Sequence, residues 1–164
     1  MGLPYPGGHA MDVLAAKGNG EAVHFPSPAL KDSLDFSFSG LKTAALNYIN
    51  TCQQNQVEVP RADLAASYTH AIVEGIAAKT AQALVGGKYK TVVLAGGVAA
   101  NSHLRVRLSE AALAHSARLC VPPVALCGDN GAMVGAAGYF AYMAGQRADT
   151  TLNATADDHP AWDR

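Results

Sequence analysis

The chain has 164 residues, of which 49% are hydrophobic, 15% charged and 7% aromatic, and its formal net charge is −1. This balance excludes a disordered chain and a coiled coil, and the length predicts a single domain with one core. Because there is no general excess of positive charge, any nucleic acid would be contacted through a local or shared surface. The richness in alanine and glycine favours helices packed closely on a sheet, and therefore an α/β fold.

Cysteine usage and hydropathy indicate the compartment. The three cysteines, Cys52, Cys120 and Cys127, are odd in number and lack CxxC spacing, so we expect neither a disulfide framework nor a structural zinc site. No segment approaches the roughly 18 apolar residues of a membrane span, and the N-terminus has no signal-peptide pattern. We therefore expect a cytoplasmic protein that does not associate with membranes.

Proline and glycine separate the predicted elements of the first third of the chain. Residues 1–8 are too rich in both for regular structure, and a helix is predicted over His9–Lys17. Apolar and polar residues alternate over Asp35–Gly40, which predicts a half-buried strand. A helix over Leu41–Cys52 follows.

The longest helical pattern covers Arg61–Val85, where apolar residues recur at intervals of three and four. Thr91–Ala95 is a short apolar run, as expected for a parallel strand covered by helices on both faces. The remaining predictions are a helix over Asn101–His115, a strand over Arg118–Val121 and a helix over Asn130–Met143. Residues 1–145 would form the folded domain and residues 146–164 a polar tail.

The Gly96-Gly97 pair marks the first candidate site. It lies where a predicted buried strand ends and a helix begins, which is where open α/β sheets bind ligands. Glycines there allow the backbone to approach a base or a ribose. Asn101, four residues after Gly97, would either cap the helix or hydrogen-bond a ribose hydroxyl.

Other candidates have equally open interpretations. The Pro6-Gly7-Gly8 loop, with Asp12 one helical turn after Gly8, is either a second backbone approach to the same ligand or an ordinary loop. Asp129 lies just before a helix, so it is either an N-cap or a metal ligand. The segment 37–43 offers hydroxyls and a lysine for an anion or RNA, or simply a helix cap.

Four sequence blocks taken together resemble the bacterial tRNA N6-adenosine threonylcarbamoyltransferase family, formerly called O-sialoglycoprotein endopeptidase. They occur in the family's order and extend over nearly the whole chain to about residue 145. The blocks are Tyr5-Pro6-Gly7-Gly8, the segment 36–43, the segment 95–105, and Cys127-Gly128-Asp129-Asn130-Gly131-Ala132-Met133.

The resemblance implies a lobe of the fold shared by actin, hexokinase and the sugar kinases. It implies transfer of a threonylcarbamoyl group from threonylcarbamoyl-AMP to N6 of adenosine 37 in tRNA. By the same resemblance, Gly8 and Asn101 would contact the adenylate, and Gly96 and Gly97 would form its adenine-side turn. Asp12, a further candidate for the adenylate site, matches a position that is acidic in some members of the family. Asp129 would be one ligand of a bound iron or zinc ion, which would polarise the intermediate as a Lewis acid.

One feature of the family pattern is missing. The resemblance implies a metal-binding HxxxH pair upstream of the Pro-Gly-Gly loop, and no pair of the six histidines has HxxxH or HxH spacing. We therefore expect only the C-terminal half, with weak metal binding, negligible transferase activity alone, and self-association through the surface that would meet the N-terminal lobe. The expected partners are tRNA, that lobe and accessory proteins of the modification complex.

Two other functions are open to the sequence. The alternative to an enzyme lobe is a non-catalytic module that binds an adenylate or a protein partner. A metallopeptidase is disfavoured because no histidine pair with an adjacent glutamate is present.

Overall fold

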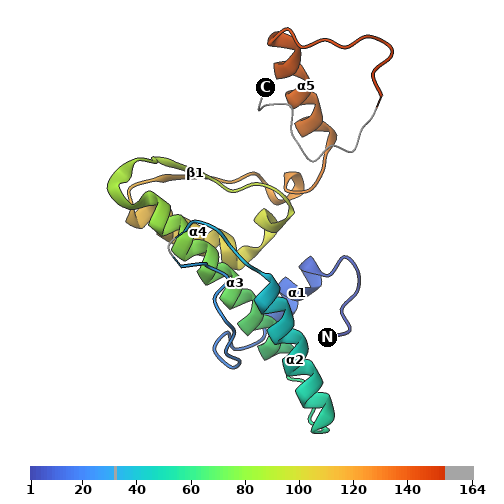
Figure 1. The fold of residues 1–164 in the computed structure, drawn as a ribbon, viewed down its shortest axis with the longest axis vertical. Coiled ribbons are helices and arrows are strands. Elements are labelled where there is room, and N and C mark those ends of the chain that lie inside the picture. Colours follow the sequence, from blue (N-terminus) through green and yellow to red (C-terminus); the bar gives the residue numbers. More distant parts are fainter. Residues whose placement is uncertain (32, 154–164) are drawn as a thin grey trace. The chain divides into compact units, whose positions relative to one another are not determined.

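The computed structural model describes residues 1–31 and 33–153 and divides the chain into two compact units, Met1–Gly128 and Asp129–Arg164. The first unit is built around α3 (Arg61–Leu84), on which α1 (Gly8–Ala15), α2 (Ser39–Gln54) and α4 (Ser102–Ala114) pack (Figure 1). Helices pack on more than one side of α3, and its buried residues include Val73 and Ala77.

Among the described residues of the first unit, the sheet has two parallel strands. β1 (Thr91–Val93) pairs with β2 (Arg118–Cys120), with Val92 opposite Leu119. α4 connects the two strands, which gives the βαβ arrangement of an α/β protein. The core between α3, α4 and the sheet contains mainly aliphatic side chains: Val73, Ala77, Leu104 and Leu108, with Leu94 and Leu119 against them.

The predicted strand over Asp35–Gly40 is wrong. That segment contributes only an isolated antiparallel bridge between Ala29 and Phe36, and α2 already begins at Ser39. The alternation of Phe36 and Phe38 does not reflect one buried face, because the two rings stack on each other and remain 40% and 42% exposed.

The strand after α3 also differs from its prediction. β1 ends at Val93, two residues early, and the Val93 side chain is 71% exposed. Cover on both faces was expected from the apolar run, but the helices of the first unit bury only one face. The predicted helices and β2 are confirmed, with ends that differ from the prediction by at most two residues.

The second unit contains α5 (Gly131–Met143), whose residues are apolar or glycine and none of which is buried. Asn130 caps this helix, since its Oδ1 accepts a hydrogen bond of 3.0 Å from the Met133 N–H. The interpretation of Asp129 as the cap is therefore wrong. The domain boundary near residue 145 stays a prediction.

Across residues 1–31 and 33–153, no helix combines the length and the apolar character required to cross a bilayer.

Candidate functional site

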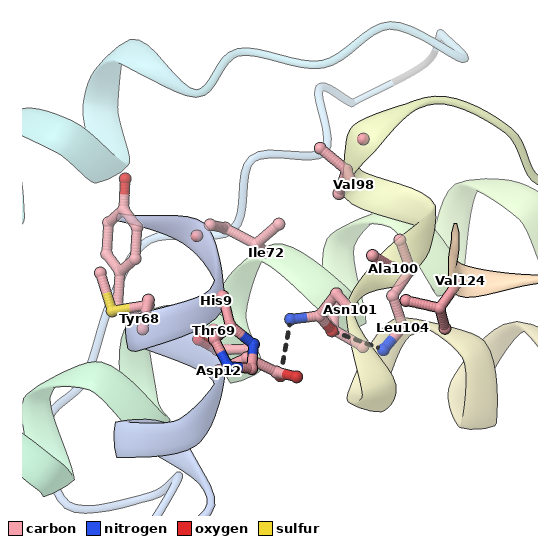
Figure 2. Close-up of a pocket in the computed structure, with 14 residues that line it drawn as sticks. His9, Asp12, Tyr68, Thr69, Ile72, Val98, Ala100, Asn101, Leu104 and Val124 are labelled. Carbon is pink, nitrogen blue, oxygen red and sulfur yellow. Dashed lines mark hydrogen bonds between the residues drawn. The ribbon is translucent and has the colours of Figure 1, made fainter. Parts of the chain in front are cut away.

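A cavity of about 370 Å³ lies in the first unit, between α1, α3 and the start of α4 (Figure 2). This volume is within the range of small-molecule sites. Its walls are mainly apolar, with a few polar groups on one side, as such sites usually are. The apolar and aromatic lining includes Met11, Tyr68, Ile72, Val73, Val98, Leu104 and Val124.

Four of the six residues predicted for the site line this cavity. Gly8 begins α1 and Asp12 lies one turn further along, while Gly97 and Asn101 come from the turn before α4. Gly96 precedes Gly97 but is not among the lining residues. The chain thus brings together two segments that lie about 90 residues apart in sequence, as the 89-residue separation of Asp12 and Asn101 shows.

A hydrogen-bond cluster joins the two segments. The Asn101 Nδ2 donates to Asp12 Oδ1 at 3.0 Å, while the Asn101 Oδ1 accepts from the Leu104 N–H at 2.8 Å (Figure 2). The Ser102 hydroxyl lies 3.2 Å from both carboxylate oxygens of Asp12. Asn101 is therefore the helix cap, and the same amide also orients Asp12 at the cavity wall.

The turn between β1 and α4 has a backbone that requires glycine. Gly96 has φ 85° and ψ 176°, a conformation that is essentially restricted to glycine. A Cβ built on Gly97 would meet no atom within 4 Å, so the backbone there faces open space at the cavity. The sequence therefore leaves the approach to this wall free of side chains.

Arg105 holds the turn from behind, and sequence reasoning missed this role. Its Nε donates to the Ala99 carbonyl at 2.5 Å, and its Nη2 donates to the Pro122 carbonyl at 2.8 Å. Nη2 also lies 3.1 Å from the Cys127 Sγ. Only the position of Arg105 within the segment 95–105 could have indicated it.

Tyr68 adds a neutral polar group to the lining. Burial raises the pKa of its hydroxyl above the ordinary tyrosine value, so the group stays protonated at neutral pH. The ring packs edge-on against Phe25, with centroids 5.6 Å apart. Tyr68 can therefore donate or accept one hydrogen bond at the edge of the cavity.

The described residues do not form a metal centre. They contain no group of three or more His, Cys, Asp or Glu side chains that could hold an ion. Asp129 is exposed and belongs to the second unit, and one carboxylate is too few to hold a first-row metal well.

Comparison with known proteins identifies the family. The family model described as tRNA N6-adenosine threonylcarbamoyltransferase matches residues 1–136. The chain belongs to the tRNA N6-adenosine threonylcarbamoyltransferase family. All four blocks on which the sequence resemblance rests lie within the matched residues.

Curated relatives carry the same name. The tRNA N6-adenosine threonylcarbamoyltransferase of Moorella thermoacetica is 46% identical over 158 residues, which are 96% of this chain and 46% of the relative. The Clostridioides difficile protein is 44% identical over 155 residues, which are 94% of this chain and 46% of the relative. The Staphylococcus epidermidis protein is 45% identical over 154 residues, which are 93% of this chain and 45% of the relative. The chain thus spans somewhat under half the length of these relatives.

Proposed function

We propose that this chain binds the adenylate part of threonylcarbamoyl-AMP in the 370 Å³ cavity, as part of an enzyme that modifies N6 of adenosine 37 in tRNA. The observation that carries the proposal is the meeting of Gly8, Asp12, Gly97 and Asn101 around one cavity in a member of this family.

The lining suggests how each part of the adenylate is held. A flat base fits between apolar side chains such as Ile72 and Val98, where the open backbone at Gly97 leaves room for it. Ribose hydroxyls are donors, and the Asp12 carboxylate is an acceptor held in place by Asn101 and Ser102. Asp12 would therefore receive the ribose.

In the proposed reaction, the N6 nitrogen of the tRNA adenosine forms a bond to the carbamoyl carbon. The bond from that carbon to the phosphate oxygen breaks, AMP leaves, and N6 loses one proton. The cavity residues would hold the leaving adenylate in position for this attack, which is the positioning contribution to catalysis.

Binding of AMP to the chain tests the proposal. Isothermal titration calorimetry should show that Asp12→Ala and Asn101→Ala each weaken AMP binding at least tenfold. Asp12→Ala removes the carboxylate that accepts from the ribose, and Asn101→Ala removes the amide that holds this carboxylate in place. Asn130→Ala is the matched control, since it removes the same kind of helix cap in α5. Unchanged AMP affinity in both cavity variants would overturn the proposal.

We also propose that the α/β arrangement is one lobe of the actin- and sugar-kinase-like fold. Family membership and the parallel strands connected through α4 support this. An experimental structure that lacked the helix and strand order of such a lobe would contradict it.

The metal stays a proposal as well. Asp129 would supply one ligand to an iron or zinc ion whose other ligands lie outside the described residues. Titration of the chain with Zn²⁺ should therefore show weak uptake that Asp129→Asn abolishes. Tight binding that survives this substitution would assign the metal to other groups.

The other proposed partners are the N-terminal lobe and accessory proteins of the modification complex. Large apolar side chains are exposed on α5, including Phe140 at 70% and Val134 at 65%, and exposed apolar surface favours association. We expect the isolated chain to self-associate, and multi-angle light scattering over a concentration series measures this. A monomer at every concentration would contradict the expectation.

A further inference from the structure

A second hollow, of about 270 Å³, lies where the end of α3 meets β1. We call it the aromatic hollow, and its lining includes Leu34, Phe36, Lys79 and Tyr89. None of its described lining residues also lines the 370 Å³ cavity. The proposed adenylate site therefore leaves the aromatic hollow without a role.

Aromatic rings are exposed around this hollow. Phe36 stacks on Phe38 with centroids 5.7 Å apart and an angle of 16° between the rings. Phe36 is 40% exposed, and Tyr89, which lies in the chain just before β1, is 49% exposed. Exposed rings of this kind provide stacking surfaces for nucleobases, whatever the base.

Positive charge accompanies the rings. Lys79 is only 7% exposed, and its ammonium donates to the Ser33 carbonyl and, at 3.0 Å, to the Gln82 Oε1, which are both neutral oxygens. The Lys88 Nζ lies 5.2 Å from the centre of the Tyr89 ring. Segment 79–91 contains a further lysine, Lys90, and no acidic residue.

The local charge favours an anionic occupant over an apolar one. The chain as a whole has a net charge of −1, so the lysines of segment 79–91 are a local concentration of positive charge. Segment 31–42, which contains Phe36, has two acidic residues, Asp32 and Asp35, and two lysines, Lys31 and Lys42, so its charges balance. Lysines interleaved with exposed rings are the combination that contacts single-stranded nucleic acid.

We propose that the aromatic hollow is an RNA contact of this protein. Unpaired bases stack on Phe36 and Tyr89, and the adjoining phosphates contact Lys88 and Lys90. The proposal rests on the proposed function, in which the substrate is a tRNA, and it assigns a surface to that substrate. Phe36 directly precedes segment 37–43, for which the sequence left an anion or RNA contact and simple capping open.

Fluorescence anisotropy with a labelled, unmodified tRNA transcript tests the proposal. Tyr89→Ala should weaken binding about tenfold, because a base loses its stacking surface, and Tyr89→Phe should bind like the parent chain. The double variant Lys88→Gln, Lys90→Gln should bind more weakly and lower the slope of log affinity against log salt by about 1 to 2.

Lys17→Gln is the matched charge control. Lys17 is exposed and lies just after α1, which packs on Ala65 and Ala66 of α3. Along α3, the first residue that lines the aromatic hollow is Lys79. About 14 residues of helix correspond to roughly 20 Å. This variant should therefore leave both tRNA affinity and the salt slope nearly unchanged.

The outcomes separate this proposal from the adenylate site. If Tyr89→Ala and the double lysine variant bind tRNA like the parent chain, or if only a protein partner binds there, the RNA contact is overturned. The adenylate site is tested separately, by titration with AMP. The variants of the aromatic hollow should keep AMP binding, and Asn101→Ala should keep tRNA binding. Loss of AMP binding in a hollow variant of normal thermal stability would also contradict the proposal, because the two surfaces would then not be separate.

Discussion

Helices α4 and α5 both have 13 residues, and both begin after an asparagine whose Oδ1 accepts the backbone N–H three residues on, at 2.8 Å from Leu104 and 3.0 Å from Met133. Their surroundings differ. α4 buries Leu104, Leu108 and Ala112 and contributes to a cavity, whereas α5 buries none of its side chains. The same local cap therefore defines where a helix begins without defining what it packs against. At Asn101, a tertiary contact with Asp12 turns the cap into part of a candidate site.

The largest expected difference between the two helices concerns their apolar side chains. Leu108 is 2% exposed in the core between α3 and α4, so Leu108→Ala should lower the free energy of unfolding by about 3 kcal/mol. Val134 of α5 is 65% exposed, and Val134→Ala should change it by less than about 0.5 kcal/mol. Urea unfolding of both variants measures the contrast. A similar loss in both would show that α5 is buried in solution.

The turns that lead into the two helices should respond differently to alanine. Gly96 has φ 85°, so Gly96→Ala should cost about 2 kcal/mol in strain. Gly128 precedes α5 without a positive φ, and a Cβ there meets no atom within 4 Å. Gly128→Ala should therefore be nearly neutral in the same unfolding experiment. Equal tolerance at both positions would mean that the turn before α4 relaxes to another conformation.

A smaller difference is expected at the caps themselves. Asn101→Ala and Asn130→Ala each remove one cap bond, which costs about 1 kcal/mol. Asn101→Ala also removes the donor to Asp12, so its total cost should be nearer 2 kcal/mol. A double-mutant cycle with Asp12→Ala isolates that extra term. Strict additivity of Asn101→Ala and Asp12→Ala would contradict the coupling.

How far the sequence predicts this molecule follows from the range of each signal. Local signals sufficed for the helices, because apolar periodicity and the residues that end a helix act over a few positions. They failed at Asp35–Gly40, where apolar and polar residues alternate although the Phe36 and Phe38 rings stack on each other and stay partly exposed. The burial of Val93 was also mispredicted, since an apolar run does not show which neighbours cover it.

The residues of the candidate site also fall into those that local signals indicated and those that depend on the fold. Gly8, Gly97 and Asn101 were indicated by turn chemistry and by resemblance, and the structure places them around one cavity with Asp12. Ser102 and Arg105 were missed because their contacts are made through the fold, Ser102 to Asp12 and Arg105 to Pro122 and Cys127. A sequence read without a fold has no means of pairing residues that lie so far apart.

The smallest expected effect concerns the ion pair between α3 and α4, for which α5 has no counterpart because residues 131–143 carry no charged side chain. Arg107 donates to both carboxylate oxygens of Glu74, from Nε to Oε1 and, at 2.9 Å, from Nη2 to Oε2. These hydrogen bonds from Arg107 lower the pKa of Glu74 below its ordinary value. Both side chains are more than a third exposed, so solvent screening limits the pair to about 0.5 kcal/mol.

The sign of the pH dependence follows from that lowered pKa. A carboxylate with a lower pKa in the folded state stabilises the fold above its unfolded pKa, and the contribution disappears as the pH falls through the folded value. The difference in unfolding free energy between the parent chain and Glu74→Gln should therefore be present at pH 7 and shrink progressively below about pH 4.5. Glu110→Gln is the control, since Glu110 bonds the same arginine from within α4 and does not link the two helices. A Glu74→Gln difference that grew as the pH fell would mean that the ionised carboxylate opposes the packing of α4 on α3.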